Sequence, residues 1–513
     1  MEPTRRHRAQ IYSNSNGGFG KRTPPGCHVA MLRMRFFQVV CGLLVFAALA
    51  GCGGAGQFGS VGQNNGNSNV VLAMTDSAPS GVTVLSAEVT LTGATLAPGN
   101  VTLFSGSTTV ELTRLQTDVA YIATAAKIPA GPYTSVKLTF ANPSLTIEND
   151  TTSSIMSGAT TCTVGSVCTI APTSTPQLSA TVPLTAFAIA SSSTTGLLID
   201  VNLANLLTSA LGEDFSAGTT VFPFMPAGTG APPVGAEDVV GHVVNVTAAS
   251  NTFTLTNAEA SYTLKVDSSS SFFQFPASAT CTAPGFACLA NNQIVSADIA
   301  IQSDGSLLAR NVLFEDADSS DAEVEGIITS TNAPSKQFKM VVLTVSGTGT
   351  GLSIGGETTV QYSTSPQTPF DVDFVHADNV QVTTTSFSSL FTGPVGLVVG
   401  QQVSIRRNSS SSSVLVADRV RLRSSRVTAT VQNVGAPNIT LDGLPFLFSD
   451  QGTVMQIQAQ TSVTPPTIYF DIDGPFSASS NILGDSISVR GPLFNTGGAN
   501  RTLVATKVVL QNP

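Results

Sequence analysis

The sequence predicts an all-β fold divided among several domains. Charged residues make up only 11% of the chain, against about 25% in ordinary globular proteins. Polarity comes instead from Ser, Thr, Asn and 45 Gly, with β-branched residues spread throughout. This mixture suits half-buried strands and turns better than helices. The 513 residues correspond to several domains at about 100–200 residues each.

Charge and residue usage exclude some classes of function. Acidic residues outnumber basic ones, 32 to 23, and no basic run occurs. Because nucleic-acid binding depends on Lys and Arg at the phosphates, we predict no nucleic-acid partner. The chain has no Trp, four His and seven Cys, so much familiar active-site chemistry is poorly supplied. We predict no cofactor.

The strongest local signal lies in residues 31–51. Arg33 and Arg35 precede an apolar run at 36–49, and the small residues Ala50-Gly51 follow it. These are the parts of a secretory signal, and the run is short for a membrane-spanning helix of about 20 residues. Leu49-Ala50-Gly51-Cys52 resembles the lipobox of bacterial lipoproteins. The resemblance implies a lipid on Cys52, cleavage before it, and an outer-membrane lipoprotein facing the periplasm or the cell surface.

An ordinary signal peptide with an incidental Cys52 is the alternative interpretation. Residues 1–30 carry no strand or helix pattern and lie upstream of a signal that should be N-terminal. We therefore expect them to be a mis-assigned extension, with translation starting at Met31 or Met34. Residues 52–69 are rich in Gly, Asn and Ser, a composition typical of a flexible tether.

Four cysteines remain after Cys52, in two close pairs. Cys162 precedes Cys168, and Cys281 precedes Cys288. In an oxidising compartment each pair is expected to form a local disulfide. A zinc site is the alternative, but the pairs have five and six intervening residues rather than two to four.

Residues 70–226 are predicted to form the first domain. Strands are expected at 82–91, 109–112, 135–140 and 197–203, because apolar residues partly alternate there. The segments Met74-Thr75-Asp76-Ser77-Ala78-Pro79, 128–138 and Leu198-Ile199-Asp200-Val201-Asn202-Leu203 resemble the bacterial family catalogued as domain of unknown function 4382. The resemblance implies an exported β-sandwich of the immunoglobulin-like or transthyretin-like kind, and no catalytic residues carry over.

After a Gly/Pro-rich linker at 227–238, the chain repeats itself in three units, at 239–318, 322–423 and 425–513. Each unit opens on a short apolar motif, at Gly241, Gly326 and near Ala429. Each has a second anchor, and these begin at Asn292, Gly400 and Gly484. Each closes on a strand containing Ala309, Ala417 or Ala505. Units of this length are tandem domains rather than solenoid repeats.

The anchors resemble the family named domain of unknown function 5666. Units one and two match its pattern, whereas unit three lacks the opening Gly. The resemblance implies three small closed barrels of about five strands, similar to OB-folds, with no established biochemical role. We expect the domains to follow one another as separate beads of a rod.

Three motifs could carry chemistry. Asp371 and Asp373 in unit two, and Asp471 and Asp473 in unit three, each place two carboxylates on one face of a strand, about 7 Å apart. Such pairs could bind Ca²⁺ or act as the acid and nucleophile of a glycosidase; the alternative is an exposed acidic face. Gly351-Leu352-Ser353-Ile354-Gly355 matches a serine-hydrolase pattern, with His376 downstream. We interpret that match as coincidental, since the elbow needs a strand-to-helix turn.

The sequence therefore predicts a lipid-anchored extracytoplasmic protein of the cell envelope. It would be non-enzymatic and would serve binding, adhesion or a structural role, with an envelope protein or polysaccharide as partner. The alternative is an exported carboxylate-dependent hydrolase or metal-dependent enzyme, using the acidic pairs or Ser353 with His376. A third hypothesis is an assembly factor that pairs strands with a partner.

Overall fold

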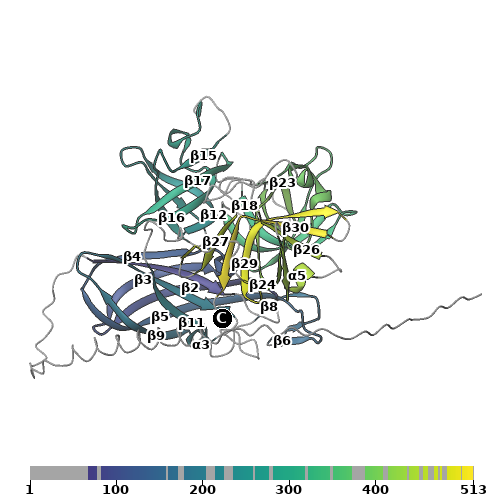
Figure 1. The fold of residues 1–513 in the computed structure, drawn as a ribbon. Helices are drawn as coiled ribbons and strands as arrows, with labels where there is room; N and C mark the ends of the chain where they lie inside the picture. The colour runs from purple at the N-terminus through teal and green to yellow at the C-terminus, as the bar shows by residue number, and fades with distance from the viewer. Residues whose placement is uncertain are drawn as a thin grey trace, which may run out of the picture. The chain divides into compact units, whose positions relative to one another are not determined.

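The structure of the protein is a computed structural model. It describes residues 68–77, 83–157, 160–170, 178–203, 214–224, 235–257, 260–275, 281–317, 322–346, 351–372, 387–407, 414–435, 438–449, 454–459, 467–471, 474–475, 482–497 and 500–511. Throughout these residues strands predominate and the helical segments are short (Figure 1). The predicted all-β class is confirmed.

The first module is a sandwich of two sheets. One sheet has the order β11-β10-β1-β4, in which β1 and β10 are parallel. Its strands are β1 (Ser68–Ser77), β4 (Ala120–Ile128), β10 (Thr194–Asn202) and β11 (Thr219–Phe224). The other has the order β3-β2-β5-β8, and β9 also pairs with β5. Its strands are β2 (Thr83–Ala97), β3 (Val101–Glu111), β5 (Gly131–Glu148), β8 (Val167–Ile170) and β9 (Ser179–Ile189).

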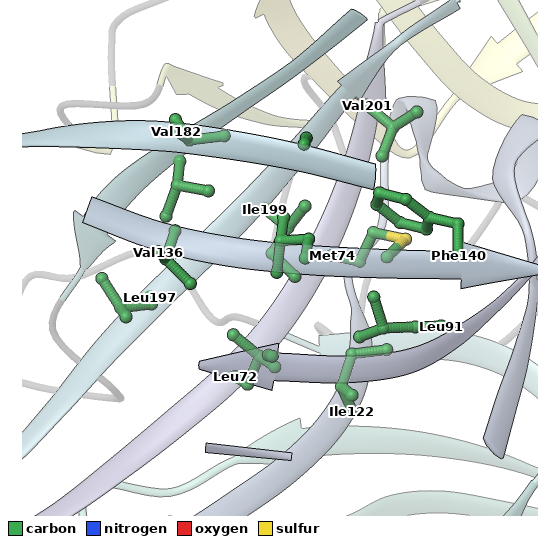
Figure 2. Packing of buried hydrophobic residues seen from close by; sticks show 14 of the residues in the cluster. Leu72, Met74, Leu91, Ile122, Val136, Phe140, Val182, Leu197, Ile199 and Val201 are labelled. Atoms are coloured by element: carbon green, nitrogen blue, oxygen red, sulfur yellow. The ribbon is translucent and has the colours of Figure 1, made fainter. Parts of the chain in front are cut away.

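Alternating apolar side chains fill the space between these sheets. Figure 2 shows Leu72 and Met74 of β1 packed among side chains of both sheets, including Val136 and Phe140 of β5. Phe140 also stacks on Phe215 of the short helix α3 (Phe215–Gly218), with ring centroids 4.5 Å apart. Burial of this set removes the apolar face of each sheet from water.

Outside the main sheets, the described residues form a small hairpin and several helical turns. The hairpin pairs β6 (Ile155–Ser157) with β7 (Thr160–Cys162). The turns are η1 (Leu112–Gln116), η2 (Phe286–Cys288), η3 (Ser388–Phe391), η4 (Pro394–Gly396) and α5 (Phe446–Ser449).

Three five-stranded barrels follow the sandwich, as predicted. In each barrel the first strand pairs with the second and fourth, and the fifth pairs with the fourth and, in parallel, with the third. This is the strand order of the OB-fold, and its closure leaves no free edge within the ring.

The barrel strands are, in chain order, β12 (Gly235–Thr247), β13 (Thr252–Thr256), β14 (Ser261–Lys265), β16 (Ile294–Ile301) and β17 (Leu307–Asp316); β18 (Ala322–Asn332), β19 (Gln337–Ser346), β20 (Glu357–Gln361), β22 (Gln402–Arg407) and β23 (Leu415–Leu422); and β24 (Ser424–Val434), β25 (Asn438–Asp442), β26 (Val454–Ala459), β29 (Ser486–Gly497) and β30 (Asn500–Ala505). A final strand, β31 (Lys507–Gln511), also pairs with β29.

The second anchor of each repeat is a left-handed turn before the fourth strand. Asn292, Gly400 and Gly484 have φ of 71°, 89° and 86°. Glycine adopts this conformation without strain, and Asn tolerates it better than most residues. In every barrel the backbone N–H of this residue donates to a carbonyl of the first strand. The repeated sequence anchor therefore links the turn before the fourth strand to the first strand by a backbone hydrogen bond.

The opening glycine marks a close approach between the first two strands. A Cβ on Gly326 would lie 2.4 Å from the carbonyl oxygen of Val341, and one on Gly241 would lie 2.8 Å from that of Thr256. In the third barrel the matching residue is Ala429, which pairs with Ile487. There the pairing with β25 ends one residue later, at Thr430.

The closing alanine of each barrel accepts the same kind of hydrogen bond. Ala309, Ala417 and Ala505 are buried, and their carbonyl oxygens accept hydrogen bonds from Ser271, Thr368 and Thr467, at 2.5, 3.1 and 2.7 Å. Each hydroxyl residue lies just before a short extra strand. This strand pairs in parallel with β17 in the first barrel, with β23 in the second and with β31 in the third. These strands are β15 (Phe272–Gln274), β21 (Phe370–Val372) and β27 (Ile468–Asp471), the last of which pairs with β28 (Gly474–Pro475).

The expectation of separate beads is wrong. Residues 64–513 form one compact unit, because the modules share cores as well as ion pairs. Val71 of β1 belongs to the core of the first barrel, while Leu85 of β2 belongs to that of the third. Residues 235–238, assigned to the linker from the sequence, begin β12; residues 227–234 lie outside the described part.

Candidate functional site: the junction of four modules

The junction is built on residues 111–119 of the sandwich, which we call the docking segment. It begins at the last residue of strand β3 and contains η1. Its first residue, Glu111, is buried and caps η1 by accepting the backbone N–H of Thr113 at 3.1 Å. Glu111 also accepts Ser86 Oγ at 2.6 Å and the N–H of Ala87 at 2.8 Å. The start of the docking segment is thus fixed to β2.

The docking segment contacts the first and second barrels. The N–H of Val119 donates to the carbonyl of Gly235 at 3.0 Å, and Arg114 Nη2 donates to the carbonyl of Asp238 at 2.8 Å. Arg114 Nη1 also pairs with Glu325 of β18 at 3.3 Å. One arginine of the sandwich therefore joins two barrels.

The same segment contacts the third barrel. Thr428 Oγ1 donates to Gln116 Oε1, and Gln511 Nε2 donates to the Gln116 carbonyl, both at 3.0 Å. Arg426 Nη2 and Arg490 Nη1 each lie 2.5 Å from a carboxylate oxygen of Asp118. All three partners in this ion pair are buried.

Asp118 remains ionised in this setting. Burial would raise its pKa, but the positive charges of Arg426, Arg490 and Lys507 outweigh burial and hold the pKa at about 2. A buried carboxylate paired with two guanidinium groups keeps its charge. Without this carboxylate, the buried charges of the two arginines would be unpaired, which would destabilise the fold.

A second buried cluster joins the first barrel to the second. Glu315 of β17 pairs with Arg419, Arg421 and Arg423, which alternate along β23 and its end. The Arg421 Nη1–Glu315 Oε2 distance is 2.7 Å. Burial would raise the pKa of Glu315, but the three arginines hold it at about 2.

Arg419 has a further buried partner in Glu323 of β18, at 3.2 Å. Burial raises the pKa of Glu323, and the neighbouring Glu315 raises it further against the attraction of Arg419.

A closed polar circuit crosses the sandwich and the second and third barrels. Gln402 donates to Glu325 at 2.5 Å and accepts Arg426 Nη1 at 3.0 Å. Because Glu325 pairs with Arg114 and Arg426 pairs with Asp118, the circuit begins and ends on the docking segment. Such a network fixes one relative arrangement of its members.

Two small cavities border the junction. One of about 60 Å³ is lined by Arg114, Gln116 and Arg426 among others, and one of about 40 Å³ by Glu111, Asp118 and Tyr262 among others. These volumes suit a few water molecules, whereas ligand pockets are commonly several hundred Å³. The arrangement therefore serves to hold modules together.

The predicted disulfides lie where the sequence places them. Cys162 and Cys168 are bonded, as are Cys281 and Cys288, with Cα–Cα distances of 5.8 and 4.8 Å. Each closes a local loop, one in the sandwich and one in the first barrel. Cys52 lies outside the described residues.

The predicted acidic pairs are placed only in part. Asp371 is held by Arg421, whose Nε and Nη2 lie 2.8 and 3.2 Å from its two carboxylate oxygens. It is thus one arm of the ionic cluster rather than a free metal ligand. Asp471 lies on β27, while Asp373 and Asp473 lie outside the described residues. Among the residues that are described, no three His, Cys, Asp or Glu side chains gather as metal ligands.

Ser353 lies exposed in a turn between β19 and β20. The flanks are strands, so the strand-to-helix elbow of a serine hydrolase is not formed there. His376 lies outside the described residues.

Sequence reasoning missed the junction residues. A signal was present: Arg419, Arg421 and Arg423 alternate with Val420 and Leu422 in a chain poor in charge. Alternation places the three arginines on one face of a strand, and the opposite face is apolar and belongs to the barrel. Such a cluster on the outer face of a barrel needs an acidic partner from another module.

The chain matches no protein-family profile and no curated protein sequence. Within the described ranges, no helix has the length and apolar character needed to cross a membrane.

Proposed function

We propose that this chain is a lipid-anchored, non-enzymatic protein of the cell envelope. It is held in the outer membrane through Cys52 and presents a body of one sandwich and three barrels, related to the domains of unknown function 4382 and 5666. The body serves binding, adhesion or a structural role toward an envelope protein or polysaccharide.

The observation that carries the proposal is that buried carboxylates at the junction pair with arginines of other modules. Asp118 and Glu315 are buried and each is shared among arginines of another module. A catalytic carboxylate needs access to a substrate in a pocket, whereas these carboxylates are enclosed by their partners. Their arrangement supports a body whose task depends on keeping its shape.

The proposed location in the cell envelope has separate support. The lipobox-like Leu49-Ala50-Gly51-Cys52 follows an apolar signal, and two disulfides are typical of proteins outside the reducing cytosol. Several acyl chains on one residue would give stable anchoring.

The alternative enzyme has less support. Its candidate Asp371 is engaged by Arg421, and its candidate Ser353 lies in an exposed turn between strands. No observation on the described residues favours the alternative over the envelope body.

Replacement of Cys52 with Ser tests the anchor. The variant should leave the membrane fraction and lose acyl mass, while Cys41→Ser, inside the apolar run, should remain anchored after processing. Retention of Cys52→Ser in the membrane with an unchanged mass would contradict the proposal.

The role of the body is tested by sedimentation of the full mature chain with purified outer-membrane vesicles and with peptidoglycan. We expect binding to one of them that is lost when the junction is broken by Asp118→Asn. Turnover of a polysaccharide or ester substrate by the purified chain would instead establish the enzyme.

A further inference from the structure

Two glutamates lie directly opposite each other at the base of the docking segment. Glu88 of β2 and Glu111 of β3 are register partners in an antiparallel pair. Directly opposed residues have Cβ atoms about 4.5–5.5 Å apart, and like charges at such positions repel. Glu88 is half-buried, and Glu111 is fully buried.

Glu111 fixes the docking segment in place. Its carboxylate accepts from Ser86, Ala87 and both the N–H and hydroxyl of Thr113. Its bonds to Thr113 hold the first turn of η1, and its bonds to Ser86 and Ala87 hold that turn to β2. Any displacement of this side chain moves the segment that contacts all three barrels.

The other charged groups beside Glu111 are engaged elsewhere. Arg114 and Asp118 line the same small cavity as Glu111, together with Tyr262 of the first barrel. Arg114 pairs with Glu325, and Asp118 pairs with Arg426 and Arg490.

The other elements packed against β2 bring no charge opposite Glu88. Its register partner on β5 is the uncharged Ser144, and Glu148 lies at the far end of that strand, opposite Thr83. On β19, which packs on β2, Lys339 pairs with Glu357.

Glu88 therefore titrates near neutrality. Burial, and then the charge of Glu111, raises the pKa of Glu88 to about 7. Burial also raises the pKa of Glu111, against its four hydrogen bonds. Because the folded-state pKa of Glu88 lies above the unfolded value of 4.5, its protonation favours the folded junction. That contribution is complete below about pH 4.5 and is lost as the pH rises through about 7.

We propose that Glu88 and Glu111 form a pH-sensitive latch, in which ionisation of both carboxylates loosens the docking segment from β2 and weakens its hold on the barrels. The latch is closed in mildly acidic surroundings and relaxed above neutrality. This inference does not depend on the membrane anchor, because it concerns only the junction.

A single-tryptophan reporter tests the latch. The chain has no Trp, so Tyr262→Trp places one indole in the cavity lined by Glu111 and Asp118. Its emission should shift with a midpoint near pH 7, and the added change Glu88→Gln should abolish that transition. Phe272→Trp, exposed on β15, should show no transition. A reporter that responds alike with and without Glu88→Gln would overturn the latch.

A second measurement keeps the proposal testable if the reporter perturbs folding. Thermal midpoints of the mature chain and of Glu88→Gln should coincide near pH 5 and diverge in favour of the variant above pH 7. Glu357→Gln, which removes a glutamate paired with Lys339 on the second barrel, should show no such divergence. Parallel profiles for wild type and Glu88→Gln would refute the proposal.

Discussion

Asp118 of the sandwich and Arg490 of the third barrel lie 372 positions apart in sequence and form a buried ion pair. Arg426 completes the group from the same barrel. The contact joins the first described module to the last, so the barrels do not simply extend away from the sandwich.

Removal of the Asp118 charge should destabilise the whole body. Asp118→Asn leaves Arg426 and Arg490 buried without their anion, a change that commonly costs about 3–5 kcal/mol. Denaturant unfolding of the mature chain measures it. Asp304→Asn, which removes an exposed partner of Lys265, should cost no more than about 1 kcal/mol. Equal losses in the two variants would contradict a special role for the junction.

Strong acid should open the junction. Asp118 and Glu315 have folded-state pKa values of about 2, below the ordinary 3.8 and 4.5. Their contribution is therefore present above about pH 4.5 and is lost as the pH falls toward 2. The free energy of unfolding should decline over this window, and less steeply in Glu315→Gln. An identical slope in that variant would show that Glu315 does not carry the acid sensitivity.

The two disulfides should contribute modestly. They join residues 6 and 7 positions apart, and the loop-entropy relation gives about 2 kcal/mol for loops of this size. Paired serine variants at Cys162 and Cys168, or at Cys281 and Cys288, should remain folded with lowered thermal midpoints. Reductant should lower the wild-type midpoint but leave a variant lacking both pairs unaffected. Global unfolding on loss of one pair would exceed what these loops explain.

The opening position of each barrel should respond according to its neighbours. Gly326→Ala forces a methyl group to within 2.4 Å of the Val341 carbonyl oxygen, and overpacking of this kind costs about 1–3 kcal/mol. Ala429→Gly, at the matching position of the third barrel, should cost only about 0.5–1 kcal/mol. Unfolding curves of the two variants decide the matter; a harmless Gly326→Ala would mean that the strands separate easily.

Local signals in the sequence were sufficient for the three repeats. The turn at Asn292, Gly400 and Gly484 needs a left-handed residue, so its signature survives as Gly or Asn at one position. The close cysteine pairs likewise needed only short-range contacts. The strands, the three repeats and the disulfides could therefore be predicted from the residues themselves, whereas the sandwich and barrel folds were implied by the family resemblances.

The junction could not be predicted in the same way, because its partners are distant in sequence. Nothing in the neighbourhood of Asp118 indicates that Arg490 will meet it. The motif at Asp371 was interpreted from its own strand, where it reads as an exposed or metal-binding carboxylate. Its actual partner, Arg421, lies 50 residues later, on the strand that β21 joins in parallel.

The position of the docking segment early in the chain has a consequence for biosynthesis. Because translation runs from the N-terminus, Asp118 is synthesised long before Arg426 and Arg490 exist to neutralise it. A chain interrupted after the second barrel would keep that carboxylate without its two arginines and would leave its site on the sandwich uncovered. The sandwich therefore reaches its final environment only after the third barrel has been made.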